Sequence, residues 1–191
     1  MRKLLFLFLF FAPFIVNATA YYVSPVGSDA SSTGSIIAPW KTLTRASAFL
    51  AAKANRGAGD TVYVRGNSGS FNGFPNNPAN GYAQLLINGL QGTATNPCVF
   101  TNYPGESPLF DFFSVVVQAA RPSPTALSIF ASSYLKIKGL RFYGYHQILD
   151  GSGVSRGVEL NGCSNITIEQ CEVFSFQGTG FFISGGTQDV L

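Results

Sequence analysis

Two segments of the chain carry the same pattern of apolar and polar positions at an offset of 31 residues. In each, a short alternating strand is followed by a polar turn and a second alternating strand. Aligning Ala126–Phe142 with Gly157–Val173 makes six apolar positions coincide: Leu127 with Val158, Ile129 with Leu160, Leu135 with Ile166, Ile137 with Ile168, Leu140 with Cys171, and Phe142 with Val173. This period indicates stacked repeats, each too small to bury its apolar face alone.

A third copy begins further along the chain. Gly180–Ile183 matches Gly157–Leu160 at an offset of 23, and Gly186–Val190 matches Gly162–Ile166 at 24. Short strands without helical stretches predict an all-β protein whose repeat is one coil of a parallel β-helix. Aligned residues then lie about 4.8 Å apart and form continuous apolar columns. Because the third copy stops at Leu191, we expect a fragment truncated at the C-terminus.

The segment before the repeats predicts a cap. Apolar residues at Leu43, Ala46, Phe49 and Leu50 form one face of a short helix over about 42–54, with Thr42 as its N-cap. The first strand is expected at Thr61–Arg65, so that the coils run from about residue 60. Residues 66–80 are rich in Gly, Asn, Pro and Ser and predict a surface loop, and further strands are expected at 85–87 and 98–101.

Residues 1–20 have the organisation of a secretory signal peptide. Arg2 and Lys3 precede the apolar stretch Leu4–Val16, and Ala18–Ala20 is a small-residue cleavage site. That apolar stretch is too short for a membrane span. We therefore expect no membrane segment after cleavage. Residues 21–191 are expected to form the N-terminal part of a single parallel β-helix domain that is secreted to the exterior, the cell surface or the periplasm.

Charge and cysteine content narrow the function classes. The chain has 12 basic and 9 acidic residues, and losing Arg2 and Lys3 leaves the mature protein nearly neutral. This balance argues against nucleic acid or an acidic membrane as partner. The three cysteines are odd in number and lie in apolar stretches, so we expect small buried side chains rather than a disulfide framework.

Several motifs resemble the N-terminal region of right-handed β-helix polysaccharide lyases and are most similar to the pectate lyases of family nine. The motifs are Tyr21–Pro25 with Gly27–Asp29, Ala38–Leu43, Gly59–Arg65, Phe100–Pro108 and Tyr134–Leu140. The resemblance implies a right-handed, pectin lyase-like β-helix. It also implies β-elimination on a uronate polysaccharide such as pectate, in which calcium neutralises the uronate carboxylate and a lysine removes the neighbouring proton.

A calcium site needs several converging oxygen ligands. The five aspartates, Asp29, Asp60, Asp111, Asp150 and Asp189, are widely separated in the sequence. The resemblance places the family's aspartate cluster and lysine beyond Leu191, so we expect no catalytic or metal-binding residue here and an inactive chain. Two alternatives stay open: a non-catalytic β-helix protein that acts at a surface or binds glycans, and a glycoside hydrolase on the same fold.

Two groups of side chains are candidates for a site. Glu169 and Glu172 have the residue type needed for glycosidase acid–base chemistry, but the 31-residue offset places Lys138 beside Glu169 and Arg141 beside Glu172, which favours surface ion pairs. Tyr143, Tyr145 and His146 follow a strand and are candidates for stacking on sugar rings; their aromatic surfaces are expected to be exposed.

Two further residues have structural interpretations. Trp40 precedes the predicted helix and is expected to act as a hydrophobic staple against the first coil. Asn165 begins a glycosylation sequon, but its position between two strands favours a turn residue in the left-handed conformation.

Overall fold

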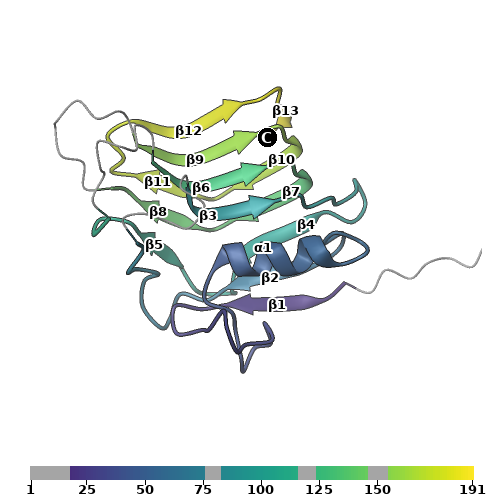
Figure 1. Cartoon of the computed structure of the whole chain (residues 1–191), viewed down its shortest axis with the longest axis horizontal. Coiled ribbons are helices and arrows are strands. Elements are labelled where there is room, and N and C mark those ends of the chain that lie inside the picture. Colours follow the sequence, from purple (N-terminus) through teal and green to yellow (C-terminus); the bar gives the residue numbers. More distant parts are fainter. Residues whose placement is uncertain (1–17, 76–82, 116–123, 146–154) are drawn as a thin grey trace, which may run out of the picture.

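Three parallel sheets wind around one core in the computed structural model, which describes residues 18–75, 83–115, 124–145 and 155–191 (Figure 1). The six-stranded sheet contains β1 (Ala20–Val23), β2 (Thr61–Val64), β4 (Cys98–Asn102), β7 (Ser133–Lys138), β10 (Ser164–Glu169) and β13 (Gln188–Val190). The three-stranded sheet contains β5 (Leu109–Asp111), β8 (Arg141–Tyr143) and β11 (Glu172–Phe174). The four-stranded sheet contains β3 (Ala83–Asn88), β6 (Thr125–Phe130), β9 (Arg156–Asn161) and β12 (Thr179–Ser184).

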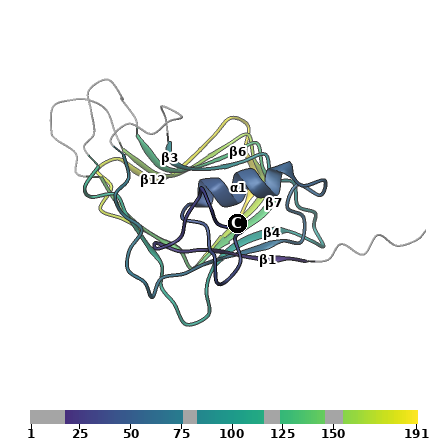
Figure 2. The same ribbon diagram turned by 60° about the horizontal axis from the view of Figure 1, so that its bottom comes forward.

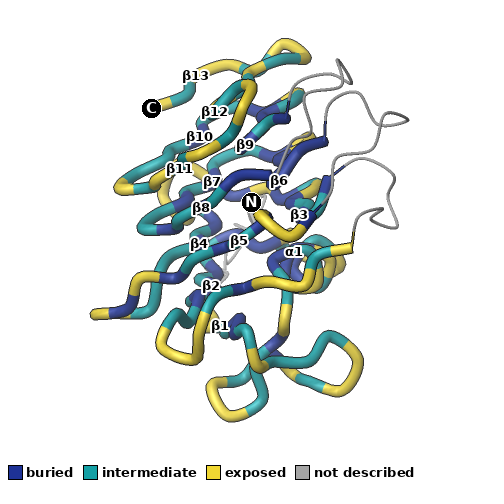
Figure 3. The backbone as a smooth tube through the Cα atoms, turned by 90° about the vertical axis from the view of Figure 1, so that its left-hand side faces the viewer, coloured by how far each residue is buried: buried dark blue, intermediate teal, exposed yellow. Residues whose placement is uncertain are grey.

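The chain visits the sheets in rotation, so each coil lies on the one before it (Figure 3). Leu135 pairs with Ile166 and Phe142 with Val173, which confirms the predicted 31-residue register. The third copy is also confirmed, because Phe181 pairs with Val158 at an offset of 23 and Val190 with Ile166 at 24. The expected parallel β-helix is therefore the observed fold.

Inward-facing side chains form columns along the coil axis. On the inner side of the three-stranded sheet, the rings of Phe110 and Phe142 stack, and Phe71 beside β5 extends the stack, with centroid separations of 4.4 Å to Phe110 and 5.3 Å from Phe110 to Phe142. All three are buried, and burial of one such side chain is worth about 1.5–3 kcal/mol. Phe71 also corrects the sequence analysis: it lies within the expected surface loop, yet it forms a bridge with Phe110 and extends the core.

Helix α1 (Leu43–Ala52) lies across the end of the coil, between the four-stranded and six-stranded sheets (Figure 2). The Thr42 hydroxyl accepts a hydrogen bond from the Arg45 amide at 3.0 Å, which confirms Thr42 as N-cap. On the other side, the hydroxyls of Thr44 and Ser47 accept hydrogen bonds from amides of the edge strand β3 at 2.8 and 2.9 Å. The helix therefore covers the core, and its hydroxyls satisfy edge amides that would otherwise be available for pairing with another strand.

The N-terminal segment contributes more than the sequence predicted. The first strand is β1, not Thr61–Arg65, and it pairs with β2 along its whole length. Its Tyr21 ring stacks on the fully buried ring of Trp40 at 5.3 Å, and Trp40 also packs 5.0 Å from Phe49 of α1. The hydrophobic staple expected of Trp40 is confirmed. No helix in the described ranges is long and apolar enough to cross a membrane.

Ion pairs join neighbouring coils on the outer surface, as the 31-residue offset predicted. Glu169 accepts from the ammonium groups of Lys136 at 2.6 Å and Lys138 at 3.5 Å, and Glu172 pairs with Arg141 at 2.7 Å. The hydrogen bond from Lys136 holds the pKa of Glu169 below its usual value. All five side chains are substantially exposed, so the pairs mark the register more than they stabilise the fold.

Two buried glutamates have opposite electrostatic environments. Glu106 accepts hydrogen bonds from the Arg65 guanidinium at 2.8 Å and from the Gly66 amide at 2.6 Å, and the Arg65 bond is the main cause of its lowered pKa. Glu159, on the outer face of β9, is only 2% exposed, and burial raises its pKa. Its carboxylate accepts from Thr125 at 3.2 Å and Arg156 at 3.3 Å.

Close stacking of the coils makes a specific demand on Gly144. A Cβ atom there would overlap the Ser175 carbonyl of the next coil, whereas one at Gly180 would lie 3.8 Å from a Val173 methyl group. We expect Gly144→Ala to lower the free energy of unfolding by about 2 kcal/mol. Gly180→Ala should stay within about 0.5 kcal/mol of wild type. Urea unfolding measures both, and equal effects would contradict this account of coil spacing.

The surface ion pairs should contribute little to stability. The double variant Glu169→Lys, Glu172→Lys replaces both acids, and we expect only a slight fall in melting temperature because exposed pairs contribute little. Thermal unfolding followed by far-ultraviolet circular dichroism measures the change. Loss of the folded state would contradict the assignment of these residues to the outer surface.

The two buried glutamates predict opposite pH effects. Glu106→Gln should lower stability at neutral pH, and the difference should shrink as pH falls below about 4, where wild-type Glu106 also loses its charge. For Glu159→Gln, wild-type stability relative to the variant should instead fall as pH rises above about 4, because ionisation of a carboxyl with a raised pKa costs the folded state free energy. Urea unfolding across acidic and neutral pH tests both. Shifts of the same sign would refute the electrostatic assignment.

Candidate functional site

The structure separates the aromatic residues that the sequence grouped together. Tyr143 lies on the outer face of β8, whereas Tyr145 is only 2% exposed and packs between Phe112 and Phe176, at 5.6 and 5.8 Å. The expected exposure of Tyr145 is therefore wrong. The reason is local: β8 ends at Tyr143, so the alternation that would direct Tyr145 outward does not extend to it, and its ring joins the core. His146 lies outside the described residues.

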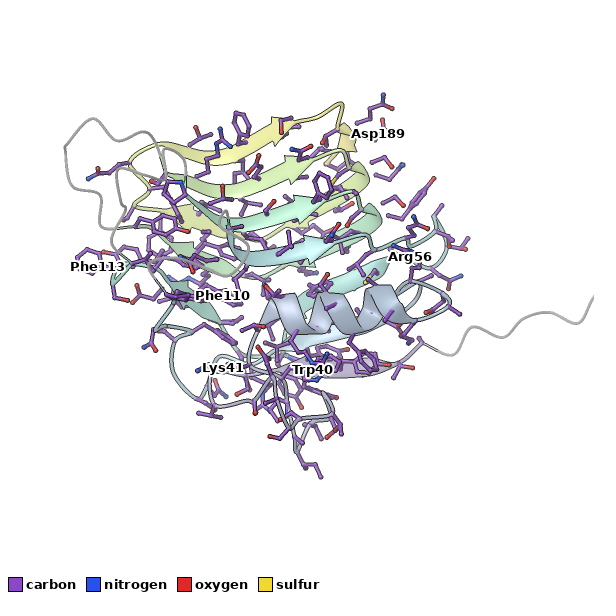
Figure 4. The ribbon with its side chains drawn as sticks, viewed as in Figure 1. Trp40, Lys41, Arg56, Phe110, Phe113 and Asp189 are labelled. Carbon is purple, nitrogen blue, oxygen red and sulfur yellow. The ribbon has the colours of Figure 1, made fainter. Side chains whose placement is uncertain are left out.

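Tyr143 belongs to a set that we call the outer aromatic row, formed by Phe113, Tyr143 and Phe174. The Tyr143 ring lies 5.8 Å from Phe113 and 5.2 Å from Phe174. Phe113 is 51% exposed, and Figure 4 shows it pointing away from the coil while Phe110 lies inside. Parallel pairing aligns Tyr143 with Phe174 on the next coil and with Asp111 on the preceding one, so Phe113 joins the row from just beyond the end of β5. The row therefore runs along the coil axis on the outer surface.

Two charged residues lie beside the outer aromatic row. The Arg141 guanidinium lies 5.6 Å from the Phe174 ring centroid and pairs with Glu172. Asp111 precedes Phe113 and accepts a hydrogen bond from its amide at 2.9 Å, which helps to fix that turn. Aromatic rings offer apolar contact, and a guanidinium offers several hydrogen-bond donors. Together they suit a ligand with both C–H surfaces and oxygen acceptors, as sugars have.

Glu169 and Glu172 do not have the environment of a glycosidase acid–base pair. A general acid for that reaction requires a raised pKa, whereas hydrogen bonding from Lys136 lowers the pKa of Glu169. Glu172 is paired with Arg141. These contacts support the structural interpretation of both glutamates.

The described residues do not offer the donor set that calcium requires. Within them, no three His, Cys, Asp or Glu side chains come close enough to hold a metal ion. Asp29 accepts hydrogen bonds from the Lys41 and Thr42 amides at 2.8 and 3.0 Å, and the buried Asp60 pairs with Lys53 at 2.5 Å. Both carboxylates are thus committed to the N-terminal cap. Asp150 lies outside the described residues.

A cavity of about 340 Å³ opens on the outer face of the six-stranded sheet, where β7, β10 and β13 begin. Its polar and aromatic lining includes Tyr134, Lys136, Asn165, Thr167 and Asp189. Asn165 has a φ of 54°, which confirms the left-handed turn position predicted for it. Residue spacing did not predict this cavity, although Tyr134, Asn165 and Asp189 occupy equivalent positions of three repeats.

Comparisons with solved structures show the fold alone. A rhamnogalacturonan lyase is 16% identical with a TM-score of 0.49, and the match covers 88% of this chain and 62% of that one. The GH136 lacto-N-biosidase from Eubacterium ramulus is 18% identical with a TM-score of 0.56, and the match covers 90% of this chain and 33% of that one. This chain thus spans less than two thirds of either structure.

Sequence comparisons are specific at the level of the family. No curated protein matches the chain. The family model described as "Pel9A-like, right handed beta helix region" matches residues 21–191, which is nearly the whole of the β-helix and its cap. The chain therefore belongs to the Pel9A-like right-handed β-helix family.

Proposed function

We propose that this chain belongs to a secreted, carbohydrate-active β-helix protein and binds uronate-containing polysaccharide through the outer aromatic row. The observation that carries the proposal is the alignment of Tyr143 with Phe174 on successive coils, extended by the exposed ring of Phe113. Membership of the Pel9A-like family supports a polysaccharide ligand. The N-terminal 20 residues support secretion.

The geometry of the row suits a polymer better than a small ligand. Adjacent coils are about 4.8 Å apart, so a chain laid along the axis meets an equivalent outward position on every coil. Arg141 lies on β8 beside the row, and Glu172 occupies only part of its donor capacity. The remaining guanidinium N–H groups suit a uronate carboxylate because their planar fork matches carboxylate geometry.

The role proposed for the described residues is binding rather than bond cleavage. The family resemblance implies β-elimination with calcium, but the part of the chain that the structure describes has neither a cluster of metal ligands nor an unpaired pair of surface carboxylates beside the row. No catalytic step is therefore assigned to these residues. Their contribution would be to hold the polymer in a fixed orientation against the coil.

The proposal predicts a specific loss on removal of one ring. Tyr143→Ala should weaken binding to polygalacturonate about fivefold, whereas Tyr143→Phe should retain most of the affinity. Tyr22→Ala removes another outward tyrosine, from a separate cluster with Tyr63, and serves as the matched control. Isothermal titration calorimetry with polygalacturonate and with neutral galactan makes the comparison. Equal binding of the two polymers, or no effect of Tyr143→Ala, would overturn the proposal.

The same samples test whether the chain also cleaves the polymer. Absorbance of unsaturated products is followed with added calcium and with a chelator, and we expect no product in either case. Calcium-dependent product would contradict a role restricted to binding. It would show that residues of this chain carry out the lyase reaction that the resemblance implies.

A further inference from the structure

The cavity beside Tyr134 is separate from the outer aromatic row. Phe113 of the row and Asp189 of the cavity project from opposite sides of the molecule in Figure 4. The cavity lies against the six-stranded sheet, whereas the row lies on and beside the three-stranded sheet. Its lining comes from three successive coils, so it is shaped by the same register that builds the core.

Three lining residues occupy one structural position. Ser133 pairs with Ser164 and Ser164 with Gln188, which places the next residues, Tyr134, Asn165 and Asp189, side by side at intervals of about 4.8 Å. All three have left-handed backbone conformations, with φ values of 48°, 54° and 52°. The fold thus requires this conformation at the start of each of these strands.

Tyr134 is an unfavourable residue for that conformation. Asn and Asp adopt it readily because their short polar side chains bond locally, whereas a bulky aromatic residue is rare there. Asn165 and Asp189 show what the backbone alone would select. Arg56, Ala131, Gln170 and Ser175 also have positive φ, but among the described residues Tyr134 is the one aromatic side chain in this conformation. Strained residues cluster at functional sites, and the Tyr134 ring lines the cavity.

Lys136 supplies a positive charge to the cavity. Lys136 and Thr167 pair across β7 and β10, and both line the cavity. The Lys136 ammonium contacts Glu169 at 2.6 Å, and Glu169 also contacts Lys138 at 3.5 Å. Two ammonium groups therefore share one carboxylate, so these three side chains carry one net positive charge, while Asp189 adds a negative charge elsewhere in the lining. An ammonium has three N–H donors, so Lys136 can bond a ligand while keeping Glu169.

We infer that this cavity binds one acidic sugar residue. The Tyr134 ring would contact the C–H face of the sugar, and Lys136 would bind its carboxylate. The Asn165 amide and the Thr167 hydroxyl would bond ring hydroxyls, and the exposed Asp189 carboxylate would accept from a hydroxyl at the far end. The choice of an acidic sugar rests on the proposed function, whereas the site itself rests on the cavity and on the conformation of Tyr134.

The first test separates a binding role from a structural one. Tyr134→Asn places a residue suited to φ 48° at this position, so the melting temperature should rise. The same substitution should weaken binding of trigalacturonate about fivefold, because the ring contact is lost. If Tyr134 has a purely structural role, the substitution should lower the melting temperature or leave binding unchanged. Either result would overturn the inference.

The second test uses two lysines that differ only in place. Lys136→Gln and Lys138→Gln each remove one positive charge from β7 and one contact to Glu169, but only Lys136 lines the cavity. We expect Lys136→Gln to weaken trigalacturonate binding about tenfold. Lys138→Gln should change it less than about twofold. Equal losses would show general surface attraction and overturn the inference.

The two proposals fail in different ways. If Tyr143→Ala weakens polygalacturonate binding but the Tyr134 and Lys136 variants bind trigalacturonate as wild type does, the proposed function stands and the cavity site is wrong. If the Tyr134 and Lys136 variants lose binding and Tyr143→Ala does not, the cavity is the binding site and the outer aromatic row is not. Neutral galactotriose serves as ligand control, and binding equal to that of trigalacturonate would contradict the role given to Lys136.

Discussion

Parallel hydrogen bonding between successive coils is the constraint on which the rest of the structure depends. It fixes which residue lies beside which, so that every inward position of one coil falls next to an inward position of the next. The stack of Phe71, Phe110 and Phe142 follows directly from this register. Changes in repeat length are confined to the connections. The offset is 23 residues between β9 and β12 but 24 between β10 and β13, because the turn from β12 to β13 has one residue more than the turn from β9 to β10.

The same constraint organises the outer surface, where no core limits the choice of side chain. Register brings Lys138 beside Glu169 and Arg141 beside Glu172, and it aligns Tyr134, Asn165 and Asp189 around one cavity. Outward columns can thus hold a charge ladder, an aromatic row or a polar pocket without disturbing the backbone. Tyr134 is instructive because its backbone conformation carries a cost that Asn165 and Asp189 avoid.

The features that the sequence predicted correctly are those that recur from one coil to the next. The apolar matches, the cross-coil ion pairs and the left-handed Asn165 all follow from aligning one coil with the next. The features that the sequence did not predict have no repeat partner or lie beyond the end of a strand. β1 and Phe71 precede the clear repeats, and Tyr145 follows the end of β8, where the alternation of inward and outward side chains stops. The cavity required both the register and the shape of the loop at Thr93.

The N-terminal cap and the outer surface have different roles in this account. Asp29 and Thr42 fix the start of α1, which covers the core at the N-terminal end of the coil. The proposed ligand contacts therefore lie at the outer aromatic row and at the cavity, and not on the cap.

The most direct test of the central claim, that the outer surface binds acidic polysaccharide, is a titration of the isotopically labelled chain with oligogalacturonate, followed by amide chemical shifts. The account predicts shifts concentrated at Phe113, Tyr143 and Phe174 and around the cavity at Tyr134 and Asn165, with α1 unaffected. An absence of shifts, or shifts concentrated on α1 and its capping loop, would contradict it.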